Sequence, residues 1–352
     1  MTLPETMRAW RVHEYGEPRD VLQIDEVPVP EPGAGEVLVR VQAIPLNLND
    51  MERITGKNMM VRPPLPTIPG MEVMGLVAAC GNGVESRQGE RVVALPKQAF
   101  GGFAEYAVCP TESAFSMPDE IPLPDAAALY FPFHLAWLGL FDRAHLERGE
   151  SVLIHAAAGG SGSAAIQLAK HAGARVFATA SSEAKLDLCR DLGADVAINY
   201  LESNFADIVL DETEDRGVDV IFDNVGESVM ADSMKCIAYD GRYLMMGFAS
   251  DKSFVDQKRL VPRAIATGNF KMCGAMLAYA GDGARRMFKR GPGWNFVPAS
   301  TGQRFMREIN ELVLAKRIKP VIGRVAGFDE LPAAIEDLAG RKTIGRTIVR
   351  LW

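Results

Sequence analysis

Residues 151–180 (SVLIHAAAGGSGSAAIQLAKHAGARVFATA) constrain the fold of this chain more than any other stretch. They begin with a buried-strand pattern at residues 152–154 and pass through small residues into a segment with helical apolar spacing. The helix ends at His171-Ala172-Gly173, and a second apolar strand follows. A strand, a helix and a second strand in this order form a βαβ unit, so the sequence predicts a parallel sheet.

The turn between the first strand and the helix is built from small residues. Ala156, Gly159 and Gly162 occupy the three positions of a G-x-G-x-x-G-like fingerprint. Small residues there let the backbone approach a pyrophosphate, and the helix N-terminus attracts its charge. Similar turns occur at ordinary strand–helix corners, but the strand before and the helix after favour nucleotide binding. The residues expected to contact the nucleotide are Ala158, Gly159, Gly160, Ser161 and Gly162.

The pattern of expected strands and helices changes along the chain. Short alternating strands separated by Pro- and Gly-rich turns fill the first third, and strands alternating with helices follow up to about residue 279. The sequence pattern of the last segment, residues 280–352, resembles that of the first third of the chain. We therefore expect an α/β protein in which a Rossmann domain with a doubly wound parallel sheet (residues 127–279) is inserted into a split β-rich domain (residues 1–126 and 280–352).

The net charge and the cysteine content indicate which kinds of molecule this protein can bind and in which compartment it functions. The net charge of −7 disfavours nucleic acid and anionic membranes as partners. Five scattered cysteines without a C-x-x-C motif predict reduced thiols, and no apolar run has membrane-spanning length. We expect a cytoplasmic protein that binds neither nucleic acid nor membrane.

The second strand of the βαβ unit ends in Ala178-Thr179-Ala180-Ser181-Ser182. A Rossmann site for NAD normally has an acidic residue here, which holds the ribose diol. A serine hydroxyl can instead donate to a 2′-phosphate, which a carboxylate would repel. Ser181 therefore favours NADPH. Two later strand ends supply Asn224 and Phe248 as candidates for lining the adenine–ribose end and the nicotinamide end of the cofactor, respectively, although ordinary strand-end turns would also explain them.

Several motifs, taken in order, resemble one family. They resemble the medium-chain dehydrogenase/reductase superfamily, in its zinc-independent quinone-oxidoreductase branch, over nearly the whole chain and least over residues 251–301. The resemblance implies that the β-rich domain is a GroES-like catalytic domain. The motifs that carry it are LVRVQA (38–43), PGMEVMG (69–75), GERVVA (89–94), HAAAGGSG (155–162) and GADVAINY (193–200).

The resemblance also implies that no metal is bound. Zinc-dependent relatives hold zinc with cysteine, histidine and acidic ligands, and the matching positions here are Asn47, Met71 and a cysteine-free stretch at 131–137. An amide and a thioether are poor ligands for Zn²⁺. Residues 96–102 likewise contain no counterpart of the four-cysteine structural lobe.

Further cofactor contacts follow from the same resemblance. Lys185 and Tyr200 match positions that close around the 2′-phosphate, Arg341 matches an arginine near the phosphates and nicotinamide, and Asn47 matches an asparagine against the nicotinamide ribose. Each residue also has an explanation that involves no cofactor. Lys185 could be a solvated helix residue, Tyr200 an aromatic residue at the edge of the domain, and Arg341 a surface arginine. The expected cofactor is NADPH.

The proton donor is left open by the sequence. Glu52 and His134 are the candidates, but a lone histidine beside aromatic residues is more often a core or rim residue. Solvent is the default source of the proton.

The activity implied by the resemblance is reduction of quinones, or of C=C bonds conjugated to a carbonyl, with a small-molecule electron acceptor as partner. The alternatives are an enoyl-thioester or enone reductase and a non-enzymatic NADPH-binding protein. The cationic segment containing Arg285, Arg286, Lys289 and Arg290 could meet a phosphate-bearing substrate or be a solvated helix face. Residues 269–277 (NFKMCGAML) form an apolar strand that predicts a homodimer.

Overall fold

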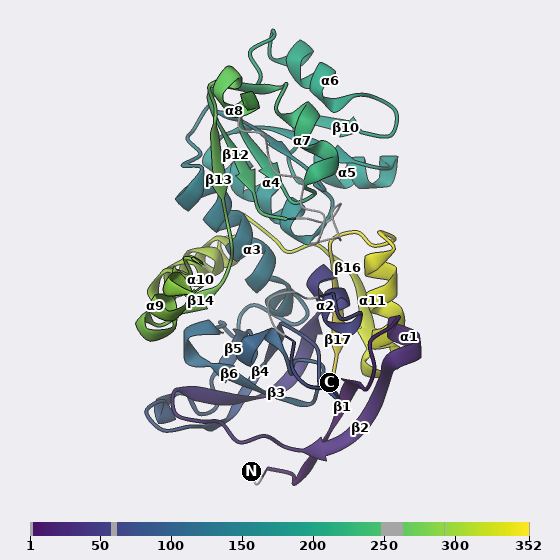
Figure 1. Cartoon of the computed structure of the whole chain (residues 1–352), viewed down its shortest axis with the longest axis vertical. Helices are drawn as coiled ribbons and strands as arrows, with labels where there is room; N and C mark the ends of the chain where they lie inside the picture. The colour runs from purple at the N-terminus through teal and green to yellow at the C-terminus, as the bar shows by residue number, and fades with distance from the viewer. Residues whose placement is uncertain (1–2, 58–61, 248–262, 292, 352) are drawn as a thin grey trace. The chain divides into compact units, whose positions relative to one another are not determined.

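The computed structural model describes residues 3–57, 62–247, 263–291 and 293–351 and divides the chain into two units (Figure 1). Unit 1 comprises Met1–Tyr130 and Ala278–Trp352, and unit 2 comprises Phe131–Leu277. The sequence places the corresponding boundaries after residues 126 and 279. Phe248, one of the predicted cofactor contacts, lies outside the described residues.

Unit 1 is built on a seven-stranded sheet in the order β16-β17-β3-β4-β5-β7, with β6 also pairing β3. The last strand of the chain, β17, pairs antiparallel with β3, so the two ends of the sequence share one sheet (Figure 1). Its strands are β3 (Glu36–Pro45), β4 (Val73–Cys80), β5 (Arg91–Ala94), β6 (Tyr106–Pro110), β7 (Ala114–Ser116), β16 (Ile322–Gly327) and β17 (Arg346–Arg350).

Smaller elements complete unit 1. A two-stranded antiparallel sheet joins β1 (Thr6–Val12) to β2 (Leu22–Pro28), and a short parallel pair joins β14 (Tyr279–Ala280) to β15 (Val297–Pro298). The helix α11 presents Leu331, Ala334 and Ile335 to the core at the i, i+3, i+4 spacing of an apolar helix face. The helices are α1 (Pro18–Val21), α2 (Leu48–Ile54), α9 (Asp282–Arg290), α10 (Ala299–Leu314) and α11 (Leu331–Ala339).

Unit 2 contains a six-stranded sheet in the order β10-β9-β8-β11-β12-β13, and every adjacent pair is parallel. The chain builds β9 and β10 on one side of β8 and then returns to build β11, β12 and β13 on the other. The doubly wound parallel sheet predicted from the sequence is therefore confirmed, with its switch point between β8 and β11. The strands are β8 (Ser151–Ile154), β9 (Arg175–Ala180), β10 (Val196–Asn199), β11 (Val218–Asp223), β12 (Ile237–Met245) and β13 (Lys271–Gly274).

The central elements of unit 2 follow from local sequence. All four residues of β8 are buried, as expected for a strand covered on both faces. The helix α4 ends at Gly173, whose φ of 88° lets its N–H reach the carbonyls of Ala169 and Lys170. The helices of unit 2 are α4 (Gly160–Ala172), α5 (Glu183–Asp191), α6 (Phe205–Glu212), α7 (Glu227–Ser233) and α8 (Arg263–Gly268), and α3 (Tyr130–Trp137) begins at the unit boundary.

One expected element differs. The sequence favours a helix over residues 228–238, but α7 ends at Ser233 and β12 begins at Ile237. Ile237 pairs with Val218 of β11 before the register shifts, so its side chain is buried by the sheet. Tertiary pairing overrides the local helical pattern here.

Candidate functional site

The turn between β8 and α4 brings the predicted fingerprint residues together. A Cβ atom added to Gly162 would lie 2.4 Å from the Ala156 carbonyl oxygen, so only glycine fits at that position. Gly159 is the N-cap of α4, and Gly160 and Ser161 begin its first turn. Ala158 precedes them in the same turn. Ala156 has a φ of 52°, a left-handed conformation that a glycine would adopt with less strain.

Three predicted contacts lie at the carboxyl ends of β9 and β10. The Tyr200 N–H donates to the Ala180 carbonyl over 3.2 Å, which places Tyr200 beside the end of β9 and hence beside Ser181. Lys185 lies in the first turn of α5, where its N–H donates to the Ser182 carbonyl over 3.1 Å. A hydroxyl, an ammonium and a phenol at one edge of the sheet form a donor set that suits a phosphate monoester.

The end of β11 carries another predicted contact, Asn224. The buried Asp223 side chain accepts hydrogen bonds from the N–H groups of Val225 and Gly226 over 2.7 and 2.9 Å and so forms the turn that contains Asn224. The end of β12 packs closely against this turn, because a Cβ atom added to Gly247 would lie 2.5 Å from the Asn224 carbonyl oxygen. The half-buried Asn224 therefore lies at the switch point, where ligands of open α/β sheets bind.

In unit 1, Asn47 belongs to a buried network with Glu72 and Arg346. Its Nδ2 atom donates to Glu72 Oε2 over 3.0 Å and to the Pro45 carbonyl over 3.2 Å, and its Oδ1 atom accepts from Arg346 over 2.8 Å. Arg346 also forms an ion pair with Glu72 at 2.5 Å. Both amide hydrogens of Asn47 are therefore used inside unit 1, which leaves only its oxygen to accept a further donor. The predicted contact with a nicotinamide ribose stays a prediction.

The sequence gives no signal for this network. Arg346 and Glu72 lie 274 residues apart, on β17 and immediately before β4. All three side chains are less than a tenth exposed, at 5% for Asn47, 0% for Glu72 and 7% for Arg346. Only the pairing of β17 with β3 brings the arginine to the other two.

The neighbouring residues do not form a zinc-binding donor set. Asp50 is fully buried and accepts the N–H groups of Asn47 and Met71 over 2.9 and 3.0 Å. Burial raises the pKa of its carboxyl to about 6, against the opposing effects of Arg53 and of these hydrogen bonds. Within the described ranges, no three His, Cys, Asp or Glu side chains are placed to hold a metal ion. A thioether from Met71 and an amide already bonded to Glu72 and Arg346 do not fit zinc.

The remaining predicted residues lie in very different surroundings. Glu52 is exposed on α2. His134 is fully buried in α3, and burial lowers its pKa to about 3, so its ring is neutral at physiological pH. A neutral imidazole can donate an N–H but is a poor acid, which makes His134 the weaker candidate. Arg341 is exposed after α11, where its φ of 58° and the bond from its N–H to the Leu338 carbonyl make it part of the helix end.

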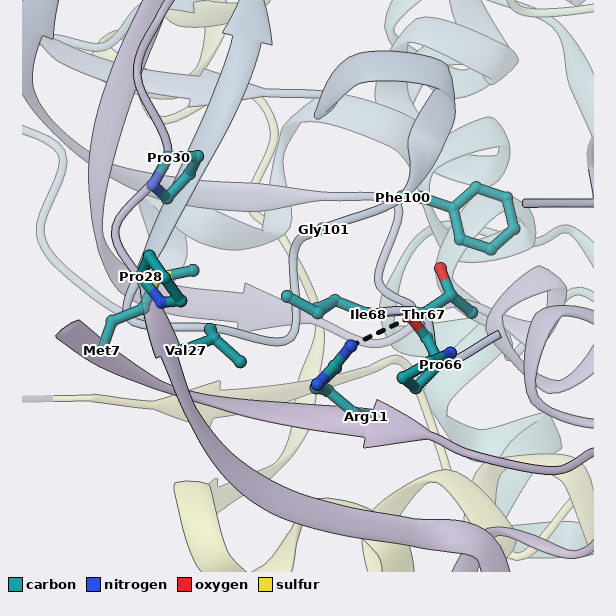
Figure 2. Close-up of a pocket in the computed structure, with 10 residues that line it drawn as sticks. All are labelled: Met7, Arg11, Val27, Pro28, Pro30, Pro66, Thr67, Ile68, Phe100 and Gly101. Atoms are coloured by element: carbon teal, nitrogen blue, oxygen red, sulfur yellow. Dashed lines mark hydrogen bonds between the residues drawn. The ribbon is translucent and has the colours of Figure 1, made fainter. Parts of the chain in front are cut away.

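Unit 1 also contains an open cavity of about 450 Å³ between the β1–β2 sheet and the segment around Ile68 (Figure 2). Its lining is mainly apolar, and Arg11 spans one side by donating to the Pro66 carbonyl over 3.1 Å. None of the predicted site residues lines it. The lining residues are Met7, Arg11, Val27, Pro28, Pro30, Pro66, Thr67, Ile68, Phe100 and Gly101.

Comparisons with known proteins agree with this arrangement. Residues 33–119 match the family model described as alcohol dehydrogenase GroES-like domain, and residues 160–286 match the one described as zinc-binding dehydrogenase. The quinone oxidoreductase of Rattus norvegicus is 34% identical over 68% of this chain and 73% of its own length. The 2-methylene-furan-3-one reductase of Solanum lycopersicum is 31% identical over 99% of this chain and 80% of its own length.

Solved structures resemble the whole chain. A mycobacterial protein solved in complex with NADPH has a TM-score of 0.83 at 28% identity, covering 98% of this chain and 99% of its own. A quinone oxidoreductase from Pseudomonas syringae pv. Tomato gives the same score, identity and coverage.

The buried ion pair of unit 1 generates a prediction about stability. Replacing Arg346 with Met should lower the free energy of unfolding by about 3–5 kcal/mol, because the carboxyl group of Glu72 would be left buried without the guanidinium that pairs with it. The double variant Arg346→Met/Glu72→Gln should recover a large part of that loss. Urea denaturation of the three proteins at pH 7 checks this. A double variant no more stable than Arg346→Met alone would contradict the role assigned to the charge pair.

Proposed function

This chain belongs to the medium-chain dehydrogenase/reductase superfamily, in its quinone-oxidoreductase-like branch, and from that premise we propose that it is an NADPH-dependent oxidoreductase. NADPH supplies a hydride when bound. The residues that would hold it in unit 2 are the fingerprint turn 158–162, Ser181, Lys185, Tyr200 and Asn224. The single observation that carries the cofactor choice is the cluster of Ser181, Lys185 and Tyr200 at the ends of β9 and β10, with a serine rather than an acidic residue directly after β9.

The acceptors are quinones or C=C bonds conjugated to a carbonyl. Such acceptors delocalise the negative charge that a hydride brings, whereas oxidation of an unactivated alcohol requires a Lewis acid to stabilise an alkoxide. The donor chemistry of Asn47 and Met71 supports zinc-independent turnover. Names of relatives point to both acceptor types, namely the quinone oxidoreductases and an NADPH-dependent alkenal/one oxidoreductase of Arabidopsis thaliana.

Two alternatives belong to other substrate or function classes. Reduction of an enoyl thioester is favoured by the exposed cations Arg286, Lys289 and Arg290 on α9, which suit a phosphate-bearing carrier. A non-enzymatic NADPH-binding protein is distinguished by cofactor binding without turnover of any acceptor. The proton that follows the hydride comes from Glu52, His134 or solvent. If one side chain supplies it, Glu52→Gln or His134→Ala lowers kcat by about 10²–10⁴-fold.

We place the protein in the cytoplasm, as its five free thiols favour. In the part of the chain that the structure describes, no helix has the length and apolarity needed to cross a membrane.

The assembly proposed is a homodimer formed through β13. This strand pairs with β12 on one side and is the last in the sheet order of unit 2. Edge strands of this kind pair readily with a second copy. We expect light scattering at micromolar concentration to report a dimer, and Met272→Pro, which places a proline within the edge strand, to weaken it. A monomer, or a dimer unaffected by Met272→Pro, would contradict this assembly.

Cofactor choice should depend on Lys185. A charge-assisted hydrogen bond to a phosphate is worth about 1.5–3 kcal/mol, so Lys185→Ala should raise the Kd for NADPH about ten- to a hundredfold. NADH affinity should be nearly unchanged. Lys235, an exposed lysine of unit 2 paired with Asp232, provides the matched control, and Lys235→Ala should alter neither constant. Fluorescence titration measures both cofactors, and equal losses for NADPH and NADH in Lys185→Ala would contradict discrimination by this lysine.

The reaction itself is tested with a panel of acceptors. The purified protein with NADPH should reduce 1,4-benzoquinone, 1,2-naphthoquinone or a conjugated enone, and with NADP⁺ it should not oxidise primary or secondary alcohols. EDTA should leave the rate unchanged, because Asn47 and Met71 do not supply zinc ligands. Faster oxidation of ethanol or propan-2-ol than reduction of every acceptor, or activity lost to EDTA and restored by zinc, would overturn the proposal.

A further inference from the structure

Five polar side chains are buried together beneath the carboxyl ends of the strands of unit 2. Each is at most 2% exposed, and each comes from a different element of the unit. His155 directly follows β8, Ser233 ends α7, and the others lie within strands. The five residues are His155, Thr179 of β9, Asp223 of β11, Ser233 and Tyr243 of β12. We call them the strand-end network.

Hydrogen bonds join the five into one unbranched chain. His155 Nδ1 lies 3.1 Å from Thr179 Oγ1, and His155 Nε2 lies 2.9 Å from Ser233 Oγ. Ser233 also hydrogen-bonds the Tyr243 hydroxyl. Tyr243 in turn donates to Asp223 Oδ2 over 2.7 Å. The chain therefore runs Thr179–His155–Ser233–Tyr243–Asp223.

The direction of every bond follows from the carboxylate at the end. Asp223 Oδ2 accepts from the Tyr243 hydroxyl, so Tyr243 uses its single hydrogen on Asp223 and must accept from Ser233. Ser233 then has no hydrogen left for the imidazole, so His155 Nε2 carries the hydrogen and donates to Ser233. His155 Nδ1 is left to accept from Thr179. The geometry thus assigns one tautomer, the neutral Nε2–H form.

The surroundings of His155 agree with a neutral ring. Burial lowers its pKa to about 3, and Phe205 packs edge-on against it with ring centroids 4.8 Å apart. The ring is fixed on both nitrogens and on one face.

The strand-end network passes directly under the predicted nucleotide contacts. His155 precedes Ala156 of the fingerprint turn, and Thr179 lies two residues before Ser181. At the other end, Asp223 holds the turn containing Asn224 through the N–H groups of Val225 and Gly226. The network therefore crosses the switch point between β8 and β11 and connects turns on its two sides.

We propose that Ser233 and Tyr243 are positioning residues that act through Asp223 and His155 to hold the Asn224 turn in register with the fingerprint turn. This rests on the proposed function, because the two turns must bind different parts of one dinucleotide. The Asn224 turn is expected to meet the adenine–ribose end and the fingerprint turn to meet the pyrophosphate, so only a ligand that reaches both turns depends on their register. Loss of the network should therefore weaken binding of the whole dinucleotide and spare binding of its adenosine fragment.

The experiment compares NADPH with 2′-AMP, a fragment that carries the adenine, the ribose and the 2′-phosphate but no 5′-phosphate. Tyr243→Phe removes one hydroxyl and should raise the Kd for NADPH about tenfold, since the bond to a buried carboxylate is lost. The Kd for 2′-AMP should change by less than about twofold, because a ligand without a 5′-phosphate does not reach the fingerprint turn and does not require the two turns to be in register. Ser233→Ala should give the same split. Isothermal titration calorimetry on the full chain measures both ligands.

Ser151 offers a matched control at the other end of β8. It is buried, and its hydroxyl donates to Asp219 over 2.8 Å, outside the strand-end network. Ser151→Ala should lower the melting temperature without changing the ratio of the two Kd values. A proportional loss for both ligands in Tyr243→Phe, or no loss for either, would overturn the inference while leaving the proposed function in place. Failure of the wild-type chain to bind either ligand would overturn both.

A second measurement tests the hydrogen-bond direction without any ligand. The ¹⁵N spectrum of histidine-labelled protein should show His155 as the Nε2–H tautomer, unchanged from pH 5 to pH 9. His155→Gln identifies its signals among those of the five histidines. An Nδ1–H tautomer, or a ring that titrates in this range, would overturn the assigned chain of bonds.

Discussion

The contact between Gly162 and the Ala156 carbonyl is the constraint on which the ligand edge of unit 2 depends. A single added carbon would lie 2.4 Å from that oxygen, so the first turn of α4 can approach the end of β8 only with glycine present. This approach aims the free N–H groups of the helix at the switch point between β8 and β11. The positive φ of Ala156 belongs to the same turn, and it shows that the chain accepts local strain to keep this geometry.

Unit 1 depends on a different interaction, the buried ion pair of Arg346 and Glu72. Burying two charges costs free energy that their attraction offsets only when further hydrogen bonds satisfy them. Asn47 supplies such bonds to both partners, donating to the carboxylate and accepting from the guanidinium. Because Arg346 begins β17 and Asn47 immediately precedes α2, the network joins segments from the two ends of the chain.

Sequence reasoning succeeded where the signal is local. The apolar run at residues 152–154 predicted the strand β8 (Ser151–Ile154), and the strand–helix–strand order predicted the parallel sheet around it. It was wrong for residues 234–238, because pairing of Ile237 with Val218 is a tertiary contact that helical spacing does not reveal. The sequence also did not predict the Arg346–Glu72 ion pair, because the two residues are 274 positions apart and meet only through a tertiary contact. Ser181 was inferred from the end of the second strand, whereas Lys185 and Tyr200 were placed near it by the family resemblance. The parallel pairing of β9 with β10 brings the ends of these two strands to one edge, and the contact with a cofactor stays a prediction.

The two units also differ in how they stabilise a buried carboxylate. Unit 1 neutralises Glu72 with Arg346, whereas the strand-end network of unit 2 holds one carboxylate, Asp223, and continues through uncharged groups. Asp223 lies on β11, two strands from β9, where Ser181 and Lys185 are predicted to meet a 2′-phosphate. Adjacent strands lie about 4.8 Å apart, so these two negative charges would be separated by roughly 10 Å or more. The separation limits the repulsion between these two charges, and a neutral His155 between them continues the hydrogen bonds without adding charge of either sign.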